Sequence, residues 1–427
     1  MWQAIGILIV FAVFAVLMVT RRISTLLALI GMAILIAIIG GVKVYPFDAK
    51  DGLIVDILGA GAIRLAAAYT SVMFGAWLGQ VMNQTGISQD IIRRAAELAG
   101  DRPLAVAIVL GIAVAFLFTT LAGLGAVIMV GTIVLPIMMT VGIKPIKAAT
   151  IFLMSVAVGL VVNLANLKTY ATMAGVKVED LQNFALVQLV VSAVVALAFI
   201  LFEMRRPEKA WAAADTGAVK EQLAKIKHVP VYSLITPLIP LALVFWGKWD
   251  VIPAFMAGIL YGAVTADLRN CLKVMTKAAH DGITDGAPAI LLMVAIGIVL
   301  KAVAAPGVSA AMQGFLQAVI PSNRYLYILF FAALAPLAIY RGPMNMWGLG
   351  GGIVGLIIKS AILPAPAAMA GFMSTERVQS AGDPTNTHNV WTSDFCKVDV
   401  NAVSLRLLPF LWVIAAVSAI LAGFMYL

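Results

Sequence analysis

Cysteine and charged residues are scarce in this sequence, and each shortage argues against a class of protein. Two cysteines among 427 residues argue against a disulfide framework and against a cysteine-based metal site. Charged residues make up 11% of the chain and hydrophobic residues 63%, which is far outside the range of soluble domains. The composition therefore predicts an integral membrane protein.

Sequence motifs of common enzymes are also missing. The chain has no Gly-x-x-x-x-Gly-Lys-Ser/Thr phosphate loop, no His-Glu-x-x-His metal helix and no Gly-x-Ser-x-Gly elbow. An intramembrane aspartyl protease would need a second aspartate to pair with Asp383, and none is evident. We therefore expect neither an enzyme nor an ATP-driven pump.

Hydrophobic residues form long continuous runs. A helix needs about 20 apolar residues to cross a bilayer, and suitable runs include 4–19, 25–39, 184–202 and 407–425. Strands of a membrane barrel would alternate apolar and polar residues, and these runs do not. The expected fold class is an all-α polytopic membrane protein of the cell membrane, of the kind found in the bacterial inner membrane.

The basic residues lie mainly in short loops between the apolar runs. The formal charge of +9 therefore indicates how the chain is oriented in the membrane, and does not indicate nucleic-acid binding. With the basic loops in the cytoplasm, the N-terminus lies outside. Because the longest hydrophilic segment is near mid-chain, we expect a first membrane repeat at 1–203, a cytoplasmic linker at 204–229 and a second membrane repeat at 230–427.

The order of the apolar segments repeats along the chain. A shift of about 220 residues aligns the two halves and places Asn166 opposite Asn386. Copies with an odd number of spans cross the membrane in opposite orientations, as in many carriers. This pattern predicts two inverted-topology repeats, each with about five transmembrane helices, a re-entrant hairpin and a broken helix.

Two polar breaks interrupt each half. An unpaired backbone amide in hydrocarbon costs several kcal/mol, so a break must face protein, water, an ion or a substrate. The expected hairpin breaks are 119–125 and 340–352, and the expected helix breaks are 162–169 and 382–389. Half-helices that end at breaks present amides to anions and carbonyls to cations. The four breaks are therefore the predicted binding site.

The candidate residues fall into two groups. Those predicted to bind substrate are Thr119, Thr120, Gly123, Gly125, Arg341, Gly342, Pro343, Asn345, Thr385, Asn386 and Thr387. Those predicted to take part in ion coupling are Asn163, Asn166, Lys168, Asp383 and His388.

Two such repeats, each with a hairpin and a broken helix that carries Asn and Thr, resemble the ion transporter superfamily of secondary carriers. That group includes the divalent anion sodium symporters and the citrate, gluconate and C4-dicarboxylate permeases. In its sodium-coupled members, Ser-Asn-Thr tripeptides at the hairpin tips bind the substrate carboxylate and help to form sodium sites. Residues 385–387, Thr-Asn-Thr, are similar but lie in the predicted broken helix, and neither tip contains Ser-Asn-Thr. The resemblance implies a carrier for a small organic anion.

Several candidates have two interpretations. Arg341 could bind a carboxylate through its planar guanidinium or could extend to the membrane interface. Asp383 and His388 could carry a coupled proton, or Asp383 could cap the next half-helix while His388 is structural. Lys168 could replace a sodium ion or extend to the outer surface. Glu376 and Arg377 are expected to pair with each other or with neighbouring residues, because isolated charges are expensive in lipid.

The sequence thus predicts a secondary active transporter for a di- or tricarboxylate or a sugar acid, working by alternating access. The coupling ion is Na⁺ or H⁺, with a sodium candidate near Asn163, Asn166 and Asn386; no other cofactor or firm metal site is expected. Membrane lipid and a second copy in a homodimer are the expected partners. The alternatives are a carrier for an amino acid or a cationic solute, with Asp383 and Glu376 as counter-charges, and a channel.

Overall fold

The computed structural model describes residues 2–20, 22–205, 226 and 228–427. Over these residues the chain is helical, with an isolated bridge between Lys43 and Gly52 and no named strand. Seven of the described helices are long and apolar enough to cross a membrane. The predicted all-α polytopic fold is confirmed, and the chain is a multi-pass membrane protein.

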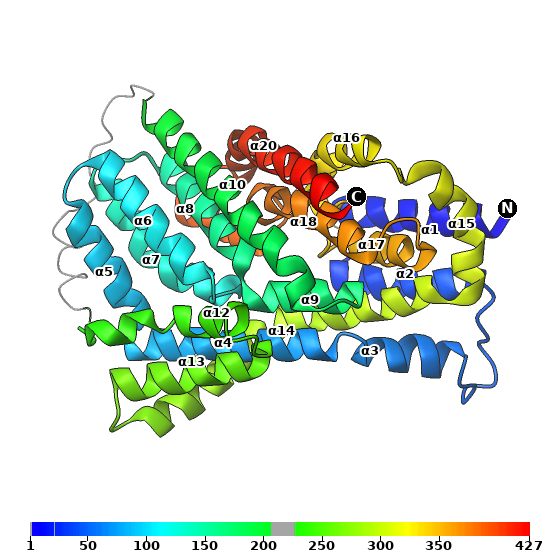
Figure 1. Ribbon diagram of the computed structural model, residues 1–427, viewed down its shortest axis with the longest axis horizontal. Helices are drawn as coiled ribbons and strands as arrows, with labels where there is room; N and C mark the ends of the chain where they lie inside the picture. The colour runs from blue at the N-terminus through cyan, green and yellow to red at the C-terminus, as the bar shows by residue number, and fades with distance from the viewer. Residues whose placement is uncertain (1, 21, 206–225, 227) are drawn as a thin grey trace.

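Helices follow one another in a similar order in the two halves (Figure 1). The first half contains α1 (Trp2–Val19), α2 (Thr25–Ile39), the π-helix η1 (Leu53–Ala60), α3 (Gly61–Ile63), α4 (Ala66–Thr85), α5 (Ile87–Ala99), α6 (Pro103–Phe118), α7 (Gly123–Thr140), α8 (Pro145–Gly159), η2 (Leu160–Val162), α9 (Leu164–Ala174) and α10 (Val178–Arg205). The second half contains η3 (Val231–Ile235), α12 (Leu238–Phe245), α13 (Val251–Ala266), α14 (Cys271–Ala304), α15 (Pro306–Val319), α16 (Arg324–Leu334), η4 (Ala335–Arg341), α17 (Gly350–Ser360), α18 (Ala365–Gly382), α19 (Thr387–Phe395) and α20 (Val400–Tyr426).

The centre of the molecule is formed by α8 and α18. Every residue from 147 to 159 in α8 and from 367 to 382 in α18 is buried. Most of the other long helices instead expose apolar side chains, as expected where a helix faces lipid. Each of the two central helices leads directly into one of the predicted helix breaks, so both breaks are positioned by surrounding protein.

The long helices α4 and α14 run antiparallel along one side of the molecule (Figure 1). The backbone of α14 also closely approaches α3 and α4 at two glycines, Gly61 of α3 and Gly282 of α14. A Cβ atom at Gly61 would lie 2.7 Å from Ile298 Cα, and one at Gly282 would lie 2.7 Å from the Trp77 nitrogen. One shift of 221 residues carries Gly61 to Gly282 and Trp77 to Ile298. Such a reciprocal contact is expected of a twofold relation between the halves, and the inverted repeat remains a prediction that it supports.

A second antiparallel pair, α10 and α20, closes the opposite side. At one end Arg406 donates to both carboxylate oxygens of the buried Glu203, at 2.9 and 2.5 Å. At the other end the Tyr426 hydroxyl donates to the Asp180 carbonyl over 2.8 Å. The two contacts fix the relative register of helices from opposite halves.

The predicted cytoplasmic linker, 204–229, lies mostly outside the described residues, which resume at Ile226 and His228. Its two ends are described. Helix α10 continues to Arg205, and the Val229 amide donates to the buried carboxylate of Asp90 in α5 over 3.4 Å. The boundaries of the two repeats therefore stay a prediction.

Candidate functional site

Asn163 joins the first helix break to the first hairpin. It is fully buried and caps α9, with its side-chain oxygen accepting from the Asn166 amide at 3.3 Å. Its Nδ2 donates to the carbonyls of Phe118 and Leu121, at 3.2 and 3.0 Å. The last carbonyls of a helix have no partner within the helix. Asn163 supplies partners at the end of α6, so the break and the tip are held together.

The first hairpin turns at residues 119–122, inside the predicted break. The Thr119 hydroxyl donates to the Phe116 carbonyl over 2.7 Å, and the buried Thr120 hydroxyl donates to the Leu117 carbonyl over 3.3 Å. Gly123 begins α7 with a φ of +85°, a conformation that favours glycine. Both threonine protons are thus committed to α6, and their oxygens remain available only as acceptors.

Asp383 plays the corresponding part in the second half and is fully buried. Its Oδ1 accepts from the Tyr340 amide at 3.0 Å and from the Thr385 amide and hydroxyl at 2.9 and 2.7 Å. Its Oδ2 accepts from the Arg341 amide at 3.2 Å and from Asn345 Nδ2 at 3.1 Å. The carboxylate therefore meets five donors, which is the arrangement that satisfies a buried charge. This bonding matches the capping interpretation of Asp383, while its proton role remains a prediction.

Asn163 and Asp383, each bonded to the hairpin tip of its own half, form two latches of opposite polarity. A shift of 220 residues carries Asn163 to Asp383 and Leu121 to Arg341. Asn163 donates to tip carbonyls, whereas Asp383 accepts from tip amides. The amides face inward in the second tip because Tyr340 and Arg341 both adopt left-handed backbone conformations, with φ of 55° and 57°.

Arg341 has its backbone fixed and its guanidinium largely uncommitted. The guanidinium donates to the Trp347 carbonyl over 3.3 Å, and the residue is only partly buried. Gly342 follows Arg341. A Cβ atom at position 342 would overlap the Leu337 carbonyl oxygen, so no side chain fits there. Pro343 is partly buried in the same turn. The second tip therefore presents one arginine from a rigid backbone.

The Thr-Asn-Thr segment spans the break between α18 and α19. Asn386 Nδ2 donates to the Ser380 carbonyl over 3.2 Å, and His388 Nε2 lies 3.0 Å from the same oxygen. Thr385 is bonded to Asp383, and Thr387 is exposed. The segment thus caps the broken end of α18, and Asn386 and His388 meet at one carbonyl.

Lys168 is paired outside the first break. Its Nζ lies 2.6 Å from Oδ2 of Asp250, the residue that caps α13. Burial raises the pKa of the Asp250 carboxyl, but the hydrogen bond and charge of Lys168, together with backbone amides at the start of α13, outweigh it and leave that pKa below its usual value. In this conformation the charge of Lys168 is therefore taken up by Asp250, and its expected role as a replacement for sodium stays a prediction.

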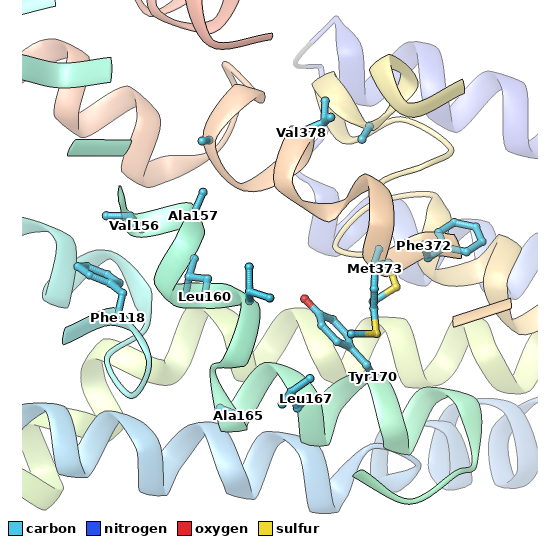
Figure 2. Close-up of a cluster of buried hydrophobic side chains, with 14 of the residues drawn as sticks. Phe118, Val156, Ala157, Leu160, Ala165, Leu167, Tyr170, Phe372, Met373 and Val378 are labelled. Atoms are coloured by element: carbon cyan, nitrogen blue, oxygen red, sulfur yellow. The ribbon is translucent and has the colours of Figure 1, made fainter. Parts of the chain in front are cut away.

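Glu376 and Arg377 lie in α18 with both side chains almost completely buried, and they form the expected ion pair. The Arg377 guanidinium also donates to the carbonyl of Ala157, near the end of α8. Figure 2 shows the adjoining core, in which Tyr170 of α9 lies beside Met373 of α18. The pair thus sits where the first helix break meets α18.

The arrangement offers groups for both kinds of ligand. An anion could be bound by the guanidinium of Arg341. A sodium ion would need oxygen ligands, and the first break holds the Asn163 side-chain oxygen and the carbonyls of Phe118 and Leu121, each with a second lone pair. Asn386 lies at the other break and uses its amide nitrogen there, so the structure does not bring all three predicted sodium residues to one break.

One acidic residue near the first hairpin was missed in the sequence predictions. Asp285 of α14 lies against Gly125 of α7 and accepts from Gln80 of α4 over 2.6 Å. A second pair, Gln84 with Asp281, forms over 2.7 Å one turn away. A signal for these contacts was available in the sequence. The two glutamines are four residues apart in α4 and the two aspartates are four residues apart in α14, so each helix carries its two polar side chains on one face.

Comparisons with known proteins give a likeness of fold. No family model and no curated protein match the sequence. The structure resembles that of MtrF from Neisseria gonorrhoeae, described as illuminating a class of antimetabolite efflux pumps, with 14% identity, a TM-score of 0.64 and coverage of 96% of this chain and 95% of that chain. It also resembles the YdaH transporter of Alcanivorax borkumensis, described as having an unusual topology, with 15% identity, a TM-score of 0.52 and coverage of 96% and 97%. At these identities the likeness shows the fold alone.

Proposed function

We propose that this chain is a secondary active transporter, and not an enzyme, that moves a small organic anion across the membrane by alternating access. The likeness of fold to two transport proteins extends over nearly the whole chain and supports this class. Two tips, each joined to a broken helix by a buried polar latch, form a centre of the kind used by secondary carriers. Membership of the ion transporter superfamily, a homodimeric state and a place in the bacterial inner membrane are parts of the same proposal.

The proposed substrate class rests on Arg341, whose backbone is held in place while its guanidinium stays available to a ligand. Asp383 holds its backbone amide, and the guanidinium keeps most of its five donors available while remaining partly exposed. A planar fork of this kind matches a carboxylate. A di- or tricarboxylate or a sugar acid is therefore the proposed substrate, with Na⁺ or H⁺ as the coupling ion.

A zwitterionic or cationic substrate is the second candidate, and Glu376 supports it. Its side chain is almost completely buried in α18 and forms an ion pair with Arg377. The adjoining Thr375 hydroxyl donates to the Met344 carbonyl over 2.9 Å, which places this part of α18 against the second tip. An ammonium group entering from the tip would meet Glu376 as a counter-charge and would compete with Arg377 for it.

A thermal-shift screen of the purified protein separates these substrates. A ligand that binds the native state at 100 times its Kd raises the free energy of unfolding by about 2.7 kcal/mol. Carboxylates and sugar acids should raise the melting temperature, and its dependence on sodium or pH identifies the coupling ion. Stabilisation by amines or amino acids alone would replace the anion proposal with the Glu376 candidate.

Direction is measured separately by flux in proteoliposomes. The MtrF structure was described in terms of efflux, whereas we propose import for this chain. Loading substrate on one side and then on the other, under the same ion gradient, shows which direction accumulates substrate. Flux that does not saturate, and that cannot accumulate substrate, would indicate a channel in place of a transporter.

A further inference from the structure

Apart from the two latches, the first hairpin touches the long helices at a small cavity. Gln80 of α4 and Asp285 of α14 line it on one side, and Ala122, Gly125, Ala126 and Met129 line it on the hairpin side. Its volume, about 20 Å³ of space for the centre of a water molecule, is enough for one ordered water. The cavity therefore gives water a place beside the partly buried carboxylate of Asp285.

Gly125 allows the hairpin to close over this carboxylate. A Cβ atom at position 125 would overlap Asp285 Oδ2 and would lie 2.7 Å from Oδ1, so any side chain would displace the carboxylate. The carboxylate accepts one hydrogen bond, from Gln80 Nε2 at 2.6 Å. The hairpin thus lies against Asp285, which is partly buried, without supplying a donor to it.

Asp285 has only neutral groups around it. Of the residues that line the cavity it alone is charged. Within the described part of the chain Asp285 forms no ion pair. The nearest turn of α14 carries Asp281, which is bonded to Gln84 of α4, and the hairpin face contributes alanine, glycine and methionine. Helix α14 is a candidate membrane span, and a carboxylate without a cation within a span is costly unless it binds a proton or a cation.

We propose that Asp285 binds the coupled proton, and that proton binding is linked to docking of the first hairpin on α4 and α14. This inference rests on the proposed function, because it assumes that the hairpin moves during transport. Docking brings Gly125 against the carboxylate, and a bound proton removes the charge that the apolar hairpin face would otherwise meet there. Departure of the hairpin opens the carboxylate to water, to which Asp285 gives the proton. Uptake and release of the proton are thus linked to the position of the hairpin.

The chain supplies a matched control for this assignment. Asp281 lies one turn before Asp285, on the same helix, and makes the same kind of bond with a glutamine of α4. It does not line the cavity under the hairpin. Asp281→Asn therefore removes an equivalent carboxylate without touching the docking contact, while Asp285→Asn keeps the shape and removes the site of protonation.

Docking is measured without any substrate by cross-linking. Ala76 and Ala126 line the cavity from α4 and from the hairpin. Cysteines at these two positions, with Cys271 and Cys396 replaced by serine, should form a disulfide under a fixed oxidant. With Asp285 present, the yield should rise several-fold as pH falls, relative to the same pair in the Asp285→Asn background. Asp281→Asn should retain the full pH dependence.

Two results would overturn the proposal. One is an identical pH profile in the Asp285 and Asp285→Asn backgrounds, which would leave Asp285 with a packing role. The other is a proton gradient that still drives accumulation in Asp285→Asn proteoliposomes. Both differ from failure of the proposed function, in which the parent protein would not accumulate any carboxylate under any gradient.

Discussion

Asp383 is bonded more heavily than the other candidate residues, and its contacts make it a structural latch of the second tip. Its five donors come from the tip and from the following helix start, so losing one oxygen leaves several of them without an acceptor. A buried donor that loses its partner costs the full desolvation penalty. At the scale of single residues, we therefore expect a substitution of Asp383 to change mainly the free energy of unfolding, and a substitution of Arg341 to change mainly substrate binding.

Asp383→Asn should lower the free energy of unfolding by roughly 2 to 4 kcal/mol, because an amide nitrogen would face donors that now point at an oxygen. Thermal unfolding in detergent measures this. Asp399→Asn is the control, since Asp399 is an exposed cap of α20 and Asn caps equally well. Equal stability of the two variants would mean that the five bonds do not hold the tip.

Arg341→Lys should weaken binding of a stabilising carboxylate by about tenfold, or about 1.4 kcal/mol, because the two-pronged fork becomes a point charge. The melting temperature of the free protein should change little, since the backbone amide held by Asp383 is kept. Arg324→Lys, in a residue stacked over Phe424, is the control for binding. Unchanged affinity in Arg341→Lys would remove its role as the anion ligand.

At single positions, the sequence indicated which residues sit at breaks and not what they bond to. The polar residues at 163 and 383 could be found because polar side chains are uncommon within the apolar runs of a membrane chain. The partners Asp250 for Lys168 and Gly125 for Asp285 are distant in sequence. Such pairs depend on tertiary packing, for which one sequence contains little signal.

At the scale of elements, helix α5 is held to the start of the second half by one buried acid. Asp90 accepts from Arg93 at 2.9 Å, from Arg94 at 3.0 Å and from the Val229 amide at 3.4 Å. Burial raises the pKa of Asp90, but the hydrogen bonds from the two arginines and the Val229 amide, together with the charge of Arg93, outweigh it and leave the pKa below its usual value. The helix is amphipathic and is not among the candidate membrane spans.

The lowered pKa of Asp90 predicts the acid dependence of stability. A carboxyl with a lowered pKa in the folded state stabilises the fold above its unfolded pKa, about 3.9, and loses that contribution as pH falls further. The parent protein should therefore be more stable than Asp90→Asn near neutral pH, and the difference should shrink below about pH 4. Thermal unfolding between neutral and acid pH tests this, with exposed Asp101→Asn as the control. A difference that is constant with pH would contradict it.

Element boundaries were predicted well where the breaks are strong. The first hairpin turns at 119–122 and α18 ends at Gly382, both inside the expected breaks. Glycine and proline mark these positions, because they disfavour a continuous helix. The opposite polarity of the two latches was not predicted, since it depends on the left-handed backbone at Tyr340 and Arg341. Neither residue is a glycine, so their side chains do not indicate that conformation.

For the whole molecule, the packing of α3 and α4 against α14 depends on two glycines. Gly61→Ala and Gly282→Ala each place a Cβ atom 2.7 Å from a backbone atom of the other helix. Each should cost about 1 to 3 kcal/mol, because backbone atoms cannot move aside as side chains do. Gly314→Ala is the control, since nothing lies within 4 Å of its Cβ position in α15, and alanine there should stabilise by about 0.5 to 1 kcal/mol. Equal effects at all three positions, measured by thermal unfolding, would argue against close packing of the halves.

The class of fold was predictable because hydrophobic runs and basic loops constrain a membrane chain strongly. How the two halves face each other was not predictable, because that relation depends on contacts between distant segments. The reciprocal contacts at Gly61 and Gly282 are part of the contact between the two halves. Binding of substrate and coupling ion depends on a few side chains in the centre, whose surroundings form only when the chain is folded.

Accumulation of substrate in proteoliposomes is the decisive test of the proposed transport activity. Purified protein is reconstituted, a sodium or pH gradient is imposed, and labelled di- and tricarboxylates and sugar acids are followed alongside Arg341→Lys. A carrier of this kind should show saturable accumulation above the equilibrium level, driven by one of the gradients, with weaker apparent affinity in the variant. Flux that only equilibrates across the membrane, or accumulation of amines with no accumulation of carboxylates, would contradict it.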